Sequence, residues 1–290
     1  MKQITILIPV FNDWSSLTKL INEINEHINN YKNINFNCLV VNDASTIKQP
    51  EMVKPNNIKL FKILNMKENR GHARCNAFGI RYVLENIDFD NLILMDGDGE
   101  DRPSEIKDLI NEAIKYPNIS VVAKRIKRSE GFFFQFLYQL HKIITLIFTG
   151  KNINFGNYSC LTRKDVEKLF SEASLWSSYT GTVKKKLKKF KEINSIRGLR
   201  YFGPSKMSFL NLLIHSFSII AVFKYQVFLR STFMIVILAY LNLYLENISI
   251  LFQILIILFN LIIFIVSLRE KKNELKNSKN NLDKEINITH

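Results

Sequence analysis

Residues 92–106 read LILMDGDGEDRPSEI, an apolar run followed at once by acidic side chains. Asp96 and Asp98 stand two positions apart at the end of a predicted strand, where both can point into one cleft. Two such carboxylates can hold one hard cation, Mg²⁺ or Mn²⁺, which would bridge a diphosphate and stabilise it as it leaves. A calcium loop is excluded because its sixth and twelfth positions are Asp101 and Lys107, not Gly and Glu. A solvated turn is the remaining alternative for Asp-x-Asp taken alone.

The first half of the chain alternates short Val- and Ile-rich runs with segments whose apolar residues recur every three to four positions. The runs predict strands and the periodic segments predict helices, so the fold class is α/β with a mostly parallel sheet. Ligands of such sheets bind beyond the carboxyl ends of the strands, which places 11–13, 42–46 and 96–101 around one cleft. The expected strands are residues 4–10, 36–42, 58–64, 92–96 and 119–123, and the expected helices cover 17–28 and 106–113.

The second half is dominated by long apolar segments. Residues 132–148 and 206–223 each carry a polar stripe on an otherwise apolar helix, which is typical of helices that lie in a membrane interface. Buried core helices are the alternative for both. Residues 225–245 and 248–268 are each long enough to cross a bilayer, and the second holds no charged residue. Only two residues separate them, so we expect a tight two-helix transmembrane hairpin.

The distribution of charge predicts the topology of this hairpin. Basic residues flank its two outer ends, from Lys224 and Arg230 to Arg269 and Lys271. The positive-inside rule places both outer ends in the cytoplasm. No cleavable signal begins the chain, so we expect a multi-pass protein of the cytoplasmic membrane with its catalytic domain and both termini in the cytoplasm. Residues 270–290 are rich in Lys, Asn and Glu, which predicts a charged cytoplasmic tail that is disordered or loosely helical.

The formal net charge of +14 favours polyanionic partners. The basic run at 184–191, KKKLKKFK, could bind nucleic acid, but beside interfacial helices we interpret it as a patch for an anionic membrane surface, with no nucleic-acid partner. Three widely spaced cysteines fit neither a disulfide framework nor a zinc site. The three histidines at 72, 141 and 215 are scattered, and we interpret them as surface or interfacial residues.

Three further motifs precede the acidic stretch in the sequence. They are PVFND at 9–13, VNDAST at 41–46 and NRGHARCNAFG at 69–79. With the acidic stretch, the chain resembles glycosyltransferase family 2, whose members have a GT-A fold. The resemblance covers four motifs spread over residues 5–106. It implies a Rossmann-like catalytic domain at 1–205, followed by the helix at 206–223, the hairpin at 224–269 and the tail at 270–290.

What the resemblance implies can be carried over residue by residue. Asp96 and Asp98 match the family's metal and diphosphate motif, and Glu100 is a candidate third metal ligand. Asp101, with Asp98, is a candidate catalytic residue, either as a base or as a group that orients the acceptor. Asn42 stands where an acid is commoner, so Asp43 is the better candidate for the contact to the nucleotide base. The implied donor-binding residues are Pro9, Phe11, Asn12, Asp43, Asn69, Gly71, Arg74 and Asp96.

The C-terminal half resembles the subgroup of this family that makes polyprenyl-phosphate sugars. Residues 197–207 (RGLRYFGPSKM) are similar to the subgroup's Arg-x-x-Gly-x-Ser-Lys segment, and 124–131 (KRIKRSEG) stands where basic residues would receive an acceptor phosphate. The segment at 154–159 lacks the subgroup's Asp and Arg, which leaves a variant acceptor open. The implied acceptor-phosphate residues are Arg125, Lys127, Arg128, Arg200 and Lys206.

Together these features predict an inverting glycosyltransferase that uses a nucleoside-diphosphate sugar and a divalent metal. The expected acceptor is a membrane lipid, first of all polyprenyl phosphate, for cell-envelope glycan synthesis. One alternative is transfer to a hydroxyl of another lipid or glycan. Another is a non-enzymatic membrane scaffold, which the intact Asp43, Asp96 and Asp98 disfavour. Homo-oligomer formation stays open.

Overall fold

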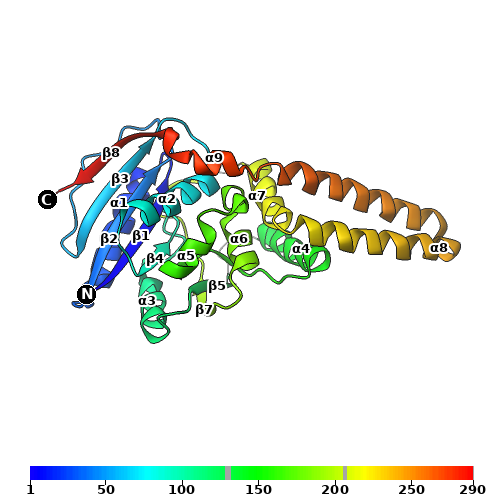
Figure 1. The fold of residues 1–290 in the computed structure, drawn as a ribbon, viewed down its shortest axis with the longest axis horizontal. Coiled ribbons are helices and arrows are strands. Elements are labelled where there is room, and N and C mark those ends of the chain that lie inside the picture. Colours follow the sequence, from blue (N-terminus) through cyan, green and yellow to red (C-terminus); the bar gives the residue numbers. More distant parts are fainter. Residues whose placement is uncertain (128–131, 205–207, 290) are drawn as a thin grey trace.

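The computed structural model describes residues 1–127, 132–204 and 208–289. Its centre is one eight-stranded sheet with the strand order β7-β5-β6-β4-β1-β2-β3-β8 (Figure 1). The strands are β1 (Lys2–Val10), β2 (Ile34–Asn42), β3 (Ile58–Met66), β4 (Asn91–Leu94), β5 (Val121–Lys127), β6 (Phe155–Thr162), β7 (Lys191–Ile196) and β8 (Leu282–Ile288).

The sheet confirms the predicted α/β class. Strands β1, β2, β3 and β4 form a continuous parallel block, and β5 pairs with β7 in parallel as well. Strand β6 runs antiparallel to both β4 and β5, and β8 runs antiparallel to β3. All five predicted strands are present within a few residues of their expected bounds, whereas β6, β7 and β8 were not predicted.

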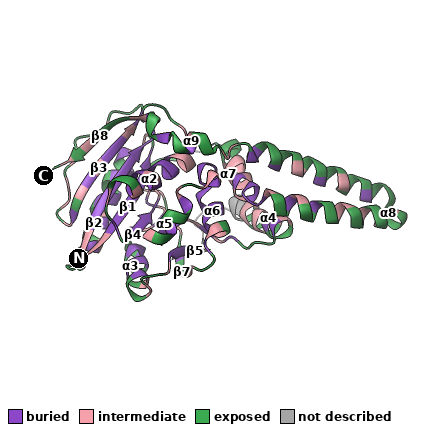
Figure 2. Ribbon diagram, viewed as in Figure 1, coloured by how far each residue is buried: buried purple, intermediate pink, exposed green. Residues whose placement is uncertain are grey.

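Two apolar cores lie on the two faces of the sheet, because successive side chains of a strand point to opposite sides. Helices α1 (Trp14–Ile28) and α3 (Ile106–Lys115) pack on one face, where they bury residues such as Leu17 and Leu109. Helices α2 (His72–Asn86), α5 (Arg163–Leu169) and α6 (Tyr179–Lys186) cover the other. The central strands of the sheet are thus buried on both faces, whereas β8 at the edge is largely exposed or half-buried (Figure 2).

The C-terminal residues correct one prediction. The expectation of a disordered or loosely helical tail is wrong, because helix α9 (Lys272–Lys276) and strand β8 return the chain to the catalytic domain. Strand β8 pairs with β3 from Phe61–Ile288 to Met66–Leu282. Lys62 of β3 supports the pairing through an ion pair of 3.0 Å to Glu285. A strand at the edge of a sheet is held by backbone hydrogen bonds and commonly carries charged side chains. The charged composition of residues 282–288 therefore did not reveal a strand.

Helix α8 (Lys224–Ser267) forms the projecting part of the molecule (Figure 1). Glu246 interrupts it with non-helical φ and ψ of 44° and −124°. A straight helix of this length would span roughly 66 Å, yet Lys224 at its start lies 2.9 Å from Glu270 beyond its end. The two arms therefore fold back on each other, and Ser249 on one arm donates a hydrogen bond to the carbonyl of Leu238 on the other.

The surface of these arms is apolar and exposed. Figure 2 shows both arms largely exposed, in contrast to the buried sheet. Among the described residues, one helical segment, Lys224–Lys276, is long and apolar enough to cross a membrane by length and composition. The segments expected in the interface are helices α4 (Phe132–Thr149) and α7 (Phe209–Ala221). Both contribute to a small core with α8, in which Val227 and Ile263 are fully buried. Crossing of a membrane stays a prediction.

Candidate active site

The carboxyl ends of β1, β2 and β4 meet at one edge, since these strands are neighbours in the sheet. Two non-glycine residues at this edge have left-handed backbone, Asn12 with φ of 52° and Ala44 with φ of 56°. The side-chain oxygen of Asn12 accepts hydrogen bonds from the amides of Thr46 and Ile47, which fixes the loop after β2 to the loop after β1. Strained backbone held by such contacts is a common feature of functional sites.

Asp43 organises the loop before α2. Its two carboxylate oxygens accept hydrogen bonds from the backbone amides of Arg70 (2.9 Å) and Gly71 (2.8 Å). Gly71 has φ of 90°, a conformation that glycine adopts without strain. Burial raises the pKa of Asp43, although the two amides act in the opposite direction. Asn42 instead contacts Asn65 and the amide of Ser45. The assignment of Asp43 to the nucleotide base stays a prediction.

The other predicted donor residues lie around the same edge. Phe11 is 37% exposed and Asn69 is exposed in the loop between β3 and α2. The carbonyl of Pro9 lies so close to Gly97 that a Cβ there would be 2.9 Å away, which explains the first glycine of the acidic stretch. Arg74 donates a hydrogen bond of 2.9 Å to the carbonyl of Arg70 and so supports the turn that Asp43 holds.

Asp96 is the most tightly held of the acidic residues. Its Oδ1 lies 3.0 Å from His72 Nε2 and accepts a hydrogen bond of 3.1 Å from Asn157. Burial alone would raise the pKa of Asp96, but the charge and hydrogen bond of His72 outweigh it and hold that pKa below its usual range. The same pair raises the pKa of His72 despite its burial. The side chain of His72 is 32% exposed, as for the surface residue expected from the sequence, but it also contacts Asp96 in the candidate site.

Asp98 and Asp101 behave differently from Asp96. Asp101 is only 4% exposed, and its Oδ2 accepts a hydrogen bond of 2.9 Å from the amide of Asp96. Burial and the neighbouring charge of Asp96 raise the pKa of Asp101 to about 7. The same two causes raise the pKa of Asp98. Carboxylates crowded in this way favour a cation among them.

Residues 197–201 form a strap over the acidic stretch. The amides of Gly198 and Tyr201 donate hydrogen bonds to the carbonyls of Glu100 (2.8 Å) and Asp98 (3.0 Å). Gly99 has φ of 86°, and a Cβ on it would meet the ring of Tyr201 at 2.4 Å, so the strap requires this glycine.

Two arginines of this strap reach the carboxylates. Arg200 Nη1 lies 2.8 Å from Asp98 Oδ2, and its other nitrogen pairs with Asp13. Arg197 pairs with Glu100.

These contacts bear on the predicted metal site. The described residues contain no group of three or more His, Cys, Asp or Glu side chains that could hold a metal ion. Glu100 pairs with Arg197 and does not join Asp96 and Asp98 as a third ligand. Mg²⁺, however, is commonly held by one or two carboxylates together with substrate phosphates. The crowded pair Asp96 and Asp98 fits a cation that arrives with the donor.

The predicted acceptor-phosphate residues do not lie in one common environment. Arg125 on β5 packs against Gly156, and burial together with the charge of Arg197 lowers its pKa. Arg200 reaches the acidic stretch through Asp13 and Asp98. Lys127 ends β5. Arg128 and Lys206 lie outside the described residues.

Several residues of the site escaped the sequence prediction. They are His72, Asn157, Asp13, Arg197 and His215. Burial together with the charges of His72 and Arg125 lowers the pKa of His215 to about 4. His72 and Arg197 stand inside the recognised motifs at 69–79 and 197–207, so their positions in these motifs could have marked them as site residues. Asp13 stands in the motif at 9–13 and Asn157 in the segment 154–159, but nothing local marked either as a site residue, because their partners Arg200 and Asp96 are distant in sequence.

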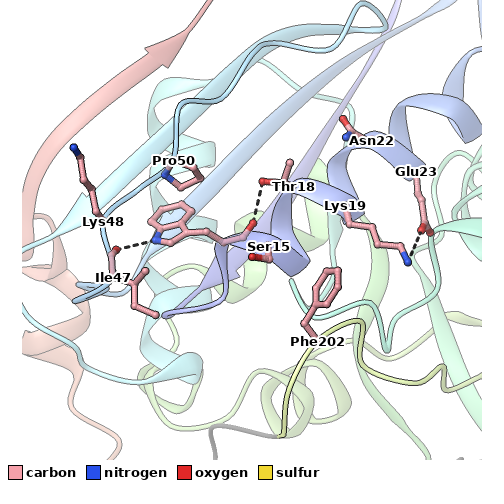
Figure 3. Close-up of a pocket in the computed structure, with 10 residues that line it drawn as sticks. Ser15, Thr18, Lys19, Asn22, Glu23, Ile47, Lys48, Pro50 and Phe202 are labelled. Atoms are coloured by element: carbon pink, nitrogen blue, oxygen red, sulfur yellow. Dashed lines mark hydrogen bonds and ion pairs between the residues drawn. The ribbon is translucent and has the colours of Figure 1, made fainter.

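A separate cavity of about 730 Å³ lies beside the site, between α1 and the loop after β2 (Figure 3). Trp14 forms part of its wall and donates a hydrogen bond of 3.0 Å to the carbonyl of Ile47. The lining residues drawn in Figure 3 include Lys19, Lys48 and Phe202. No residue of the predicted site lines this cavity.

Comparison with known proteins identifies the family. The model of the family described as glycosyl transferase family 2 matches residues 5–178. The fold is similar to glucosyl-3-phosphoglycerate synthase from Mycobacterium tuberculosis, solved with Mn²⁺, UDP-glucose and phosphoglyceric acid. That comparison has a TM-score of 0.55 and 12% identity and covers 78% of this chain and 80% of that one.

A second structure with the same fold is the mannosyltransferase PcManGT from Pyrobaculum calidifontis, solved with GDP-mannose and Mn²⁺. It gives a TM-score of 0.51 and 13% identity, with 92% of this chain and 87% of that one covered. No curated protein matches the chain.

Proposed function

The chain belongs to glycosyl transferase family 2, and from this premise we propose that it transfers a sugar from a nucleoside diphosphate to a phosphorylated membrane lipid. Glycosyltransferase activity with a nucleotide sugar follows from the family. The acceptor, the metal and the membrane location are proposals. The observation that supports them best is the acidic stretch, where Asp98 pairs with Arg200 of the strap at 2.8 Å and the charge of Arg125 on β5 acts on Asp101.

On the donor side, Asp43 and the exposed ring of Phe11 would receive the nucleotide, with Asn12, Asn69 and Gly71 shaping the backbone around it. Asp96 and Asp98 would hold a divalent cation, Mg²⁺ or Mn²⁺, which supplies neutralisation of the leaving diphosphate. Arg200 lies on Asp98 and can turn from the carboxylate to a phosphate oxygen, because a guanidinium serves both partners equally well.

On the acceptor side, the attacking oxygen of a lipid phosphate is already ionised at neutral pH, so little help from a general base is needed. Asp101 would then orient the acceptor by holding the loop after β4, where it accepts a hydrogen bond from the amide of Asp96. Arg125 would neutralise the acceptor phosphate, since its guanidinium lies near Asp96 and Asp101 in a buried setting. The family resemblance implies inversion at the anomeric carbon.

A direct test is incubation of the purified protein in detergent with a panel of nucleotide sugars, MgCl₂ or MnCl₂, and polyprenyl phosphate. We expect a lipid-linked sugar detected by mass spectrometry. Transfer only to a lipid that bears a hydroxyl group would contradict the phosphate acceptor and favour the hydroxyl acceptor. The absence of transfer from every donor would contradict the proposed activity.

Replacement of Arg125 by alanine is expected to raise the KM for polyprenyl phosphate about tenfold, as loss of a charge-assisted hydrogen bond does, and to spare donor binding. Detergent removes any anionic surface, so the effect would not reflect membrane attachment. Lys124→Ala is the matched control, because Lys124 is adjacent on β5 and pairs with Glu192 at 3.4 Å. An unchanged acceptor dependence for Arg125, Arg128 and Arg200 variants alike would favour a hydroxyl acceptor.

We further propose that α8 anchors the enzyme in the cytoplasmic membrane as a two-helix hairpin. Its exposed apolar arms suit a lipid environment, and basic residues lie at the ends nearest the catalytic domain. The pairing of β8 with β3 gives independent support, because both ends of α8 must then be on the side of the catalytic domain.

This topology predicts the labelling of single cysteines. A cysteine that replaces exposed Asn247 should react with an impermeant maleimide on intact cells, whereas one that replaces exposed Asn280 should react only after permeabilisation. The native Cys38, Cys75 and Cys160 are buried, so they should not react with the maleimide in the folded protein. The reverse pattern would place the catalytic domain outside, away from nucleotide sugars.

A further inference from the structure

Helix α9, which follows the hairpin, packs against the catalytic domain through buried Leu275 and through a hydrogen bond to Trp176. Trp176 ends a short 3₁₀ helix (Ala173–Trp176) and is 1% exposed. Its indole Nε1 donates a hydrogen bond of 3.0 Å to Glu274 Oε2 on α9. The other oxygen of Glu274 binds Lys271 at 2.6 Å. A carboxylate partner makes this hydrogen bond a charge-assisted one, which fixes the plane of the indole ring.

The ring of Trp176 also contacts Arg74, one of the predicted donor-binding residues. The guanidinium carbon of Arg74 lies 5.8 Å from the centre of the Trp176 ring, within the range of a cation–π interaction. Arg74 in turn donates to the carbonyl of Arg70, whose amide is bound by Asp43. The path from Glu274 through Trp176 and Arg74 therefore ends on the turn that Asp43 holds.

The electrostatics of Arg74 show why it needs such support. Burial lowers the pKa of its guanidinium, and the positive charges of Arg269 and Arg70 act in the same direction. The carboxylate of Glu274 and that of Asp43 oppose them. Without Glu274, Arg74 would keep its two cationic neighbours and lose part of the negative charge that stabilises its position.

We propose that Glu274 and Trp176 are positioning residues for nucleotide-sugar binding, acting through Arg74 on the Arg70–Gly71 turn. The segment that returns from the hairpin is thus part of the machinery that shapes the donor site. This inference rests on the proposed function, because it takes Arg74 as a donor-site residue. Its consequence is that the donor site is complete only when the chain after α8 is docked on the catalytic domain.

The test uses the full chain in detergent, titrated with UDP-glucose and with GDP-mannose in the presence of MnCl₂ by calorimetry. For the nucleotide sugar that the wild type binds, Glu274→Ala should weaken binding about tenfold, because the indole of Trp176 loses its charge-assisted hydrogen bond and Arg74 loses a neighbouring carboxylate. The KM for the donor should rise by the same factor, while kcat at saturating donor and the KM for the acceptor stay unchanged.

Two variants separate positioning from simple anchoring of α9. Glu274→Gln should recover part of the affinity, because its amide oxygen still accepts the indole N–H while the negative charge near Arg74 is lost. Lys271→Ala removes the neighbouring ion pair of 2.6 Å and should bind donor like the wild type. If Glu274→Ala fails to fold, Trp176→Phe keeps an aromatic ring but loses the indole N–H and part of the ring that Arg74 contacts, and it should also weaken donor binding, by about threefold or more.

Unchanged donor affinity in Glu274→Ala would overturn the inference while leaving the proposed function in place. Equal weakening in Glu274→Ala and Lys271→Ala, with the same fall in Tm, would also overturn it and leave α9 as an anchor. A wild type that binds neither nucleotide sugar and transfers none would overturn the proposed function together with this inference.

Discussion

Replacement of Asp98 by asparagine is expected to lower kcat by about two orders of magnitude or more, the usual cost of losing one charged group that stabilises a developing anion. Asp98 stands with Asp96 at the end of β4, and burial beside Asp96 raises its pKa. Such a crowded carboxylate gains most from a cation, so its neutral analogue should bind the metal and diphosphate poorly. The measurement is kcat with the preferred nucleotide sugar at saturating MgCl₂ or MnCl₂.

The fold of this variant should be retained. Asparagine keeps the size of the side chain, and its oxygen can still accept the hydrogen bond of 3.0 Å from the amide of Glu100. Arg200 also keeps its second partner, Asp13. Asp88→Asn is the matched control, because Asp88 forms an exposed ion pair with Arg163. Near-normal turnover of Asp98→Asn, or full activity of the wild type in excess chelator, would rule out the metal assignment.

The second large effect is expected from truncation after Asn277, which removes β8. We expect Tm to fall by about 10 °C or more, because β3 would lose its ladder of backbone hydrogen bonds. Tyr82 and Lys62 would also lose Glu285, which lies 2.6 Å from the tyrosine hydroxyl. The measurement is thermal unfolding of the full and truncated chains in the same detergent.

A single substitution provides the comparison for this truncation. Glu285→Gln weakens only the contacts with Lys62 and Tyr82 and should change Tm by no more than about 2 °C, as partly exposed ion pairs contribute little. If the truncated chain unfolds at the same temperature as the full one, β8 is not part of the cooperative fold. The disordered tail expected from composition would then be the better description.

The sequence was most informative where a pattern is local. The apolar runs before Phe11, Asp43 and Asp96 are strands because each is a continuous Val- and Ile-rich segment, and a parallel sheet buries both faces of its strands. Family motifs at the ends of these strands were recognisable for the same reason, since each is contained in a few consecutive residues. Strand β7 carried no such pattern, because four of the six residues of KEINSI are polar.

The sequence by itself determined the α/β class and the strand ends at which the candidate site lies, and it predicted Asp43, Asp96 and Asp98 as the acids of that site. Only the tertiary structure decided what these acids contact. Arg200 and Asp13 are 187 residues apart, and Trp176 and Glu274 are 98 apart. The physical reason is that a strand or helix is specified by neighbouring residues, whereas an ion pair between distant segments depends on how the whole chain packs. The return of β8 to the sheet, which joins the chain after the hairpin to the donor edge, is of this second kind.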